Sequence, residues 1–138
     1  MTWRGGLYTK SISARLKPYL FFAAGWLVPG LGHFLQHKRA KAAVFFGGVL
    51  AMVGLGLLMH GGFAPYAGLE PLSALSFLGG VGSGIFYFAG KLAGAGVGNL
   101  WAYTYQYGAA YIAAAGFMNL LVALNAATLA RAREIGRV

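Results

Sequence analysis

Four long apolar stretches without any charged side chain occupy most of this chain. They are residues 18–36, 42–59, 72–90 and 109–130, and none of them contains Asp, Glu, Lys or Arg. About 20 apolar residues of helix cross the hydrocarbon core of a bilayer, and each stretch comes close to that length. The sequence therefore predicts an all-α, polytopic integral membrane protein, a bundle of four transmembrane segments within one membrane domain, residues 18–130.

The composition argues against a soluble domain. Hydrophobic residues make up 59% of the 138 residues and charged residues 9%, whereas a typical soluble domain has about 25% charged residues. A soluble fold would have to bury four continuously apolar helices on all sides, and a chain of this length cannot supply that cover. The 23 glycines suit helix packing in lipid, where small residues let helices approach closely.

The net charge of +9 comes from cations at the borders of the apolar stretches. They gather in a basic interfacial N-terminal tail (1–17), in the polar turn 36–41 and in a basic C-terminal tail (131–138). Lipid headgroups attract cations at such positions by about 1 kcal/mol each, so membrane lipids are the expected partner and nucleic acid is not. The candidate headgroup contacts are Lys38, Arg39, Lys41, Arg131 and Arg133.

The N-terminal tail is expected to contain a short interfacial helix, capped by Ser11 or Ser13 and running into Lys17. Pro18 would then turn the chain into the membrane. A basic tail before an apolar run also resembles a signal peptide. However, the apolar run continues past Pro29 with no clear small-x-small cleavage site, so we expect the segment to be retained.

The first apolar segment is interrupted by Pro29-Gly30 and by Gly32. Proline removes a backbone donor and glycine permits conformations closed to other residues, so the segment is either a kinked helix or a hairpin that returns to its starting face. We predict that Pro29, Gly30, Gly32 and His33 form a structural hinge, in which the imidazole bonds the freed carbonyls. An ordinary proline kink with an incidental histidine is the alternative.

The distribution of cations bears on topology. Four crossings place both tails on one side with seven Lys and Arg against four, which predicts a bacterial inner-membrane protein with both termini in the cytoplasm. The hairpin alternative gives eight against three, with the C-terminus outside. We expect four crossings because a 19-residue apolar run fits a single crossing better. The aromatic stretch 91–108, with Trp101 and three tyrosines, is typical of a membrane–water interface.

Glycine spacings predict helix packing faces in the second half of the chain. Gly80 and Gly84, and likewise Gly90, Gly94 and Gly98, lie four residues apart and would share one helical face. The partner of such a face lies either within the chain or in another copy or subunit. The alternative is that these spacings arise by chance in a glycine-rich chain.

Two asparagines, Asn119 and Asn125, lie within the last apolar stretch. An amide in hydrocarbon needs a hydrogen-bond partner, so we expect helix packing through interhelical bonds. The alternative is that they line a transport path. Since no span contains an acidic or basic residue, a proton relay or an ion-coupled carrier is not indicated.

No constellation of residues indicates catalysis or a cofactor. The two carboxylates, Glu70 and Glu134, lie far apart, and the chain has no cysteine. His33 and His37 have a spacing that can ligate a metal or haem, but the neighbouring Lys38 and its basic turn would repel a cation. We therefore expect no enzymatic activity and no cofactor.

The run from Val28 to Phe34 (VPGLGHF), followed by a basic turn and an apolar helix, resembles the two-transmembrane-domain family. Leu35-Gln36 stands where that family usually has Tyr-Leu-Gly, and the likeness covers about residues 19–59. The runs 105–108 (YQYG) and 115–121 (AGFMNLL) look similar to uncharacterised small bacterial membrane proteins with the same front half. The resemblance implies a helical hairpin built on residues 29–34, and it does not imply any catalytic activity.

The functional expectation follows from these observations. A chain with no reactive constellation but with glycine faces and paired amides is expected to be a non-enzymatic accessory or scaffold subunit that acts by helix packing. Its partners would be lipids, other membrane subunits or a second copy. The first alternative is a small channel or carrier, with the broken first span and Asn119 lining a path. The second is a cofactor-binding subunit of an electron-transfer complex.

Overall fold

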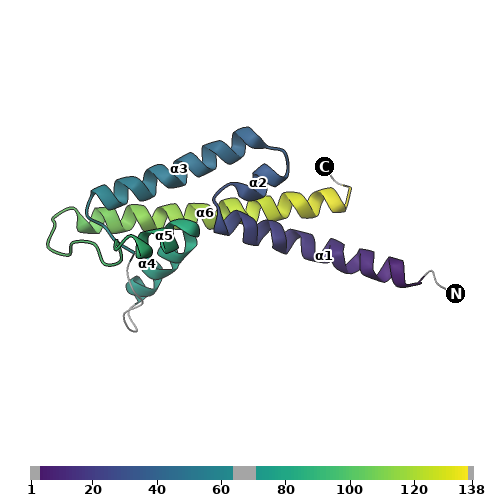
Figure 1. Cartoon of the computed structure of the whole chain (residues 1–138), viewed down its shortest axis with the longest axis horizontal. Helices are drawn as coiled ribbons and strands as arrows, with labels where there is room; N and C mark the ends of the chain where they lie inside the picture. Colours follow the sequence, from purple (N-terminus) through teal and green to yellow (C-terminus); the bar gives the residue numbers. More distant parts are fainter. Residues whose placement is uncertain (1–3, 64–70, 137–138) are drawn as a thin grey trace.

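The structure is a computed structural model, which describes residues 4–63 and 71–136, with side chains from Arg15 onwards except that of Leu72. The described residues form helices and no strand, so the all-α prediction is confirmed. Residues 64–70, which lie between the predicted spans 42–59 and 72–90 and include Glu70, are outside the described residues. The helices in Figure 1 are α1 (Arg4–Leu27), α2 (Leu31–Leu35), α3 (Arg39–Leu58), α4 (Pro71–Gly82), α5 (Ile85–Leu92) and α6 (Tyr105–Glu134).

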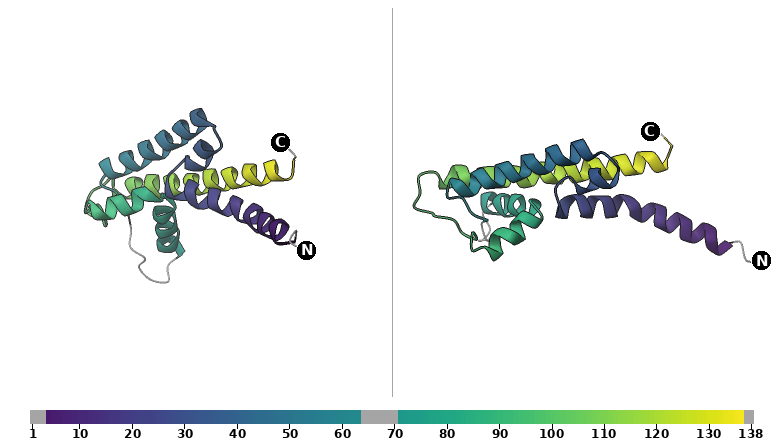
Figure 2. Two further views of the ribbon diagram at one scale, coloured as in Figure 1. Left: turned by 45° about the vertical axis from the view of Figure 1, so that its right-hand side comes forward. Right: turned by 45° about the horizontal axis from the view of Figure 1, so that its top comes forward.

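The 30-residue α6 is the axis on which the other long helices pack. Helix α3 runs antiparallel to it, because Gly56 lies against Gly108 whereas the earlier Gly48 lies near the later Met118. Figure 2 shows α1 along the yellow C-terminal half of α6, with α4 and α5 toward its green N-terminal half. The core lies between α3, α4, α5 and α6 and contains Val49, Val53, Phe63, Tyr87, Ile112 and Ala115.

Two of the four predicted spans appear as continuous helices long and apolar enough to cross a membrane, namely α3 and α6. Helices α4 and α5 together reach that length and composition, but the chain bends by 102° between them. The predicted first span, residues 18–36, is not confirmed, since it is divided between the end of α1 and the short α2. The described residues therefore provide two candidate membrane spans, or three if the bent pair counts as one.

The predicted boundary at Pro18 is wrong. Residues from Arg4 to Leu27 form one continuous helix with Pro18 inside it, so the basic tail and the first apolar segment are not separate elements. A proline removes one amide donor from a helix, while the remaining main-chain bonds of the helix can still form. The long helix carries the described cations Arg15 and Lys17 on the N-terminal side of its apolar part.

The first chain break lies at Val28–Gly30. Gly30 has φ 81°, a left-handed conformation that glycine adopts without steric cost, and it directly precedes α2. Gly30 also touches the backbone of Ala42 near the start of α3. Helix α2 thus leads back toward the end from which α1 came, and the first segment has the geometry of the hairpin alternative.

The second chain break lies at Ser83–Gly84. Gly84 has φ 63° and directly precedes α5, so the predicted single span 72–90 is interrupted after Gly82. Both halves of the chain therefore follow the same order: a helix, a break at a left-handed glycine, a short helix and a long helix. The segments α1–α2–α3 and α4–α5–α6 therefore share one arrangement of helices along the chain.

The two ends of the molecule differ in composition. Helix α1 begins, α3 begins and α6 ends at the right-hand end of Figure 1, which we call the basic end. Of the cations with described side chains, only Lys91 lies toward the other end. That opposite end carries Trp101 and Tyr103, whose side chains are 94% and 100% exposed. The loop that holds them is fixed to the end of α3, because Thr104 Oγ1 donates to Met59 O at 2.8 Å.

Candidate functional site

Asn119 lies at the middle of α6, where both chain breaks meet. Its side chain is fully buried, and Nδ2 donates to Trp26 O and to Gly82 O, each at 2.8 Å. These carbonyls belong to the last turns of α1 and α4, which have no further helical amide to bond them. One amide group of α6 therefore caps two helix C-termini at once.

The two breaks also touch each other directly. Trp26 Nε1 of α1 donates to Val81 O of α4 at 3.1 Å. A Cβ atom on Gly84 would meet the carbonyl oxygens of Trp26 and Leu27, so only glycine lets the breaks approach this closely. Each such bond contributes about 1 kcal/mol, and an unmet buried carbonyl costs about 1–3 kcal/mol.

One polar atom at this junction has no bond. Asn119 Oδ1 is buried and finds no hydrogen-bond donor among the described residues. An amide oxygen with free lone pairs can accept a bond from a hydroxyl or amide group or contact a cation. The junction therefore combines main-chain carbonyls of two broken helices with one amide oxygen that accepts no hydrogen bond from the described residues.

A second polar cluster fastens α2 to α6. His33 is 1% exposed, and its Nε2 lies 3.1 Å from Asn125 Oδ1. The neighbouring Gln36 donates from Nε2 to Ala126 O at 2.8 Å. His33 Nδ1 and Gln36 Oε1 are buried and without a partner among the described residues.

The predicted role of His33 toward the carbonyls freed by Pro29 is wrong. Its ring reaches Asn125 and packs 5.1 Å from the ring of Phe45. Two carbonyls near the break have other donors, since Trp26 O accepts from Asn119 Nδ2 at 2.8 Å and Val28 O accepts from Leu31 N at 2.9 Å. The imidazole is directed away from the break because α2 turns it toward α6.

The paired-histidine alternative does not assemble a ligand site. His37 lies beyond the end of α2 with φ 62°, and its side chain is exposed while that of His33 is buried. The two rings therefore do not share a helical face. Within residues 4–63 and 71–136, no group of three or more His, Asp or Glu side chains is close enough to hold a metal ion.

The predicted glycine faces are not helical faces. Gly84 lies in the second break, and Gly94 and Gly98 lie in the loop after α5, with φ 79° and 69°. Gly80 is in ordinary contact with Tyr87 and Phe63, and Gly90 packs closely against Phe63. The four-residue spacing of glycines does not produce a helical face here, because the helices end at Gly82 and Leu92, before each repeat is complete.

Other glycines, which the sequence analysis did not select, make the close helix contacts. Gly79 and Gly82 of α4 touch the backbone of Ala113 and Gly116 in α6. Gly56 of α3 and Gly61 touch Gly108 in the same way. The three-residue step from Gly79 to Gly82 was a signal for such a face, but it is common in a glycine-rich chain.

One face of small residues is left open, on α3. Ala43, Gly47 and Ala51 lie four residues apart and are exposed, and Gly54 follows on the same side. A Cβ atom on Gly47 or Gly54 would meet no atom within 4 Å. We call these four residues the α3 small face, and no described part of the chain fills it.

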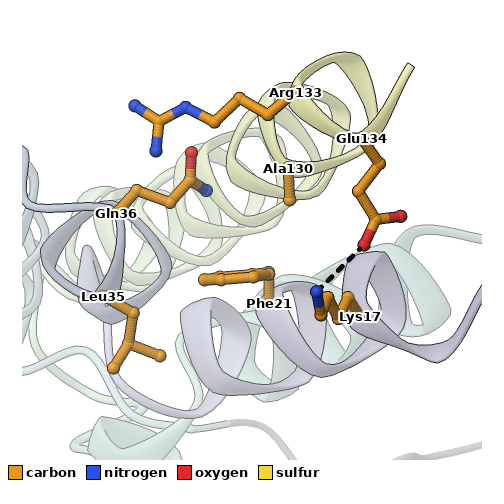
Figure 3. A pocket seen from close by; sticks show the side chains of 7 residues that line it. All are labelled: Lys17, Phe21, Leu35, Gln36, Ala130, Arg133 and Glu134. Carbon is orange, nitrogen blue, oxygen red and sulfur yellow. Dashed lines mark ion pairs between the residues drawn. The ribbon is translucent and has the colours of Figure 1, made fainter. Parts of the chain in front are cut away.

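A groove between α1, α2 and α6 opens at the basic end (Figure 3). It has a volume of about 370 Å³. Lys17 Nζ lies 3.5 Å from Glu134 Oε1 across it. We call it the basic groove; its lining residues are Lys17, Phe21, Leu35, Gln36, Ala130, Arg133 and Glu134.

The remaining predicted headgroup residues lie at the same basic end, at the start of α3 and the end of α6. Arg39, Lys41 and Arg131 are exposed, and Lys38 is half-buried in the turn before α3. The Arg39 guanidinium carbon lies 5.9 Å from the centre of the Phe34 ring, a cation–π distance. The basic turn and the C-terminal tail are thus brought to one end of the molecule.

Comparison with known proteins identifies a family but no characterised relative. No curated protein and no solved structure matches the chain. A family model matches residues 20–137, well beyond the region 19–59 that carries the two-transmembrane-domain resemblance. The chain belongs to this family, which is described as a family of unknown function, DUF6677.

Proposed function

We propose that this chain is a non-enzymatic protein of the bacterial inner membrane with two complete crossings, α3 and α6. Helices α1–α2 and α4–α5 would enter from opposite faces and meet at Asn119, halfway along α6. The gathering of cations at one end supports a cytoplasmic basic end, and hence cytoplasmic termini, by the positive-inside rule. The exposed Trp101 and Tyr103 would lie at the opposite interface.

Within that membrane protein we propose an accessory or scaffold role exercised through the α3 small face. The observation that carries this proposal is the open space beside Gly47 and Gly54, where a Cβ atom would meet no described atom within 4 Å. By contrast, Gly79 and Gly82 of α4 pack against α6 of the same chain. Small residues repeated every four positions let a second transmembrane helix approach closely, and dispersion contacts then hold the pair. The occupant would be another copy or another membrane subunit.

The test is Gly47→Leu, compared with Leu50→Ala, which also alters an exposed position of α3. The structure has open space at Gly47, so the substitution should leave the fold intact and remove only the close approach. We expect crosslinking in bilayers, to itself or to co-purifying membrane proteins, to fall at least about tenfold for Gly47→Leu, equivalent to 1.4 kcal/mol. Unchanged crosslinking would contradict the scaffold role.

A second candidate, a small channel or carrier, is favoured by one specific observation. Two broken helices from opposite ends meet at Asn119, and Asn119 Oδ1 is vacant. Discontinuous helices with their termini near the bilayer midplane form the binding sites of many transporters. Flux of small neutral and cationic solutes into proteoliposomes tests this directly. Selective flux that Asn119→Asp changes and Asn125→Asp does not would replace the scaffold proposal.

A further inference from the structure

We propose that the basic groove is a binding site for one anionic phospholipid. The inference rests on the membrane location proposed above, and not on association through the α3 small face. The groove lies between three helices at the basic end, where the boundary between lipid tails and headgroups would fall. Binding in this groove would differ from a general attraction of headgroups to exposed cations. The groove has charged residues at its rim, apolar residues on its floor and walls formed by three helices.

The rim of the groove provides the charge that selects an anion. Lys17 and Arg133 contribute two positive charges and Glu134 one negative charge, which leaves the rim at +1. Figure 3 shows Glu134 joined to Lys17, while the Arg133 side chain extends over Gln36, away from that ion pair. Arg133 has no carboxylate partner among the described residues, so its guanidinium is free to bond a phosphate with two parallel N–H donors.

The floor of the groove provides the surface that selects a lipid over a free phosphate. Phe21 of α1, Leu35 of α2 and Ala130 of α6 present apolar groups, and Leu35 is about half exposed. A phosphate, a nucleotide or a sugar phosphate would leave these groups uncovered. An acyl chain covers them, with a gain of about 25 cal/mol for each Å² of apolar surface removed from water.

The walls of the groove are fixed in position. Gln36 is 4% exposed, and its Nε2 bond to Ala126 O holds α2 against α6. Lys17 and Glu134 hold the facing wall of α1 near the end of α6. The groove is therefore formed before the lipid arrives, and binding would strengthen the attachment of α1 to α6.

The experiment measures lipid retention and thermal stability of the purified chain in a neutral detergent. Phosphatidylglycerol is the probe, and phosphatidylcholine and soluble glycerol phosphate are the comparison ligands. We expect phosphatidylglycerol alone to remain bound in native mass spectrometry and to raise the melting temperature. Equal shifts with phosphatidylcholine, or a full shift with glycerol phosphate, would overturn the proposal.

Matched variants locate the site. Arg133→Gln should lower phosphatidylglycerol retention at least about fivefold, whereas Arg131→Gln and Arg39→Gln remove the same charge at the same end and should change it less than about twofold. Leu35→Gln alters the floor at an exposed position and should also lower retention without changing the charge. Equal effects of Arg133→Gln and the two control variants would show only general attraction and would overturn the site.

A third outcome concerns the occupant. If a peptide segment of another membrane protein co-purifies in the groove and blocks phosphatidylglycerol, the lipid proposal is wrong. Gly47→Leu should leave lipid retention unchanged. Failure of the lipid site and failure of the scaffold role are therefore separate results.

Discussion

Two glycines of α4, Gly79 and Gly82, and two of α3, Gly47 and Gly54, lie in helices of similar apolar character but have opposite surroundings. Gly79 and Gly82 touch the backbone of α6, and a Cβ atom at either position would overlap with Ala113 or Gly116. A Cβ atom on Gly47 or Gly54 would meet no atom of the described residues within 4 Å. In lipid, where no hydrophobic force drives helices together, close approach through small residues is a main source of attraction. The difference separates glycines already used to build the fold from glycines still available for contact.

The largest effect is expected at the inner glycines. A Cβ atom on Gly116 would overlap with the carbonyl oxygen of Gly79, which belongs to backbone and cannot move aside. We expect Gly116→Leu to abolish folded protein, because overpacking between two backbones exceeds the 1–3 kcal/mol typical of side-chain crowding. Yield of monodisperse protein in size-exclusion chromatography measures this. A folded Gly116→Leu protein would mean that α4 does not pack on α6 as described.

The next largest effect is expected at the first break. Gly30 combines φ 81° with close contact to Ala42 O, and Gly32 lies between Ala126 and Phe21. Gly30→Val or Gly32→Val should lower folded yield much more than Gly54→Val, since left-handed strain at Gly30 alone costs about 1–3 kcal/mol and a Cβ atom on Gly32 would overlap with the Ala126 side chain. Equal tolerance of valine at all three positions would reduce the predicted hinge Pro29–His33 to an ordinary kink.

A smaller loss is expected on removing the shared cap. Asn119→Leu leaves the buried Gly82 O and the half-buried Trp26 O without this donor, which should lower the free energy of unfolding by about 2–4 kcal/mol. Asn125→Leu is the control, because Asn125 is exposed and, among the described residues, only His33 loses a bond. Denaturant unfolding in mixed micelles measures both. Similar losses for the two variants would argue against a special role for the junction.

The smallest effect, and of opposite sign, is expected on α3. Gly47→Ala should raise the free energy of unfolding by up to about 1 kcal/mol, because alanine is the better helix former and meets no neighbour. Gly82→Ala should lower it, since the added methyl group meets Gly116. The same measurement in micelles serves for both variants. A loss of stability in Gly47→Ala would show that the small face is filled.

The sequence located the crossing helices well and the broken ones poorly. The expected spans 42–59 and 109–130 lie within or close to α3 (Arg39–Leu58) and α6 (Tyr105–Glu134), because hydropathy and length fix a straight apolar helix. Hydropathy also predicts spans at 18–36 and 72–90, because it measures how apolar a segment is and not where the chain changes direction. Direction is set by Gly30 and Gly84, and nothing local distinguishes these two from the other glycines.

For the candidate site, only the type of interaction could be predicted from the sequence. Asn119 was expected to bond another helix, and an amide inside an apolar stretch required that. Its partners are main-chain carbonyls at two helix ends, and these become available only after the breaks exist. The basic groove was beyond the sequence for the same reason, since Lys17, Leu35 and Arg133 meet only when α2 turns back along α6.

The position of Asn119 in the last helix has a consequence for biosynthesis. In the membrane arrangement proposed above, α1 and α4 would be inserted with uncapped C-terminal carbonyls, because the residue that caps them is synthesised only with α6. Until then, water or other hydrogen-bond donors must satisfy these groups, because bare carbonyls are costly in hydrocarbon. We therefore expect the final arrangement of both broken helices to form only after translation is nearly complete. A ribosome-bound chain that ends before Asn119 should be inserted but open to protease at both breaks.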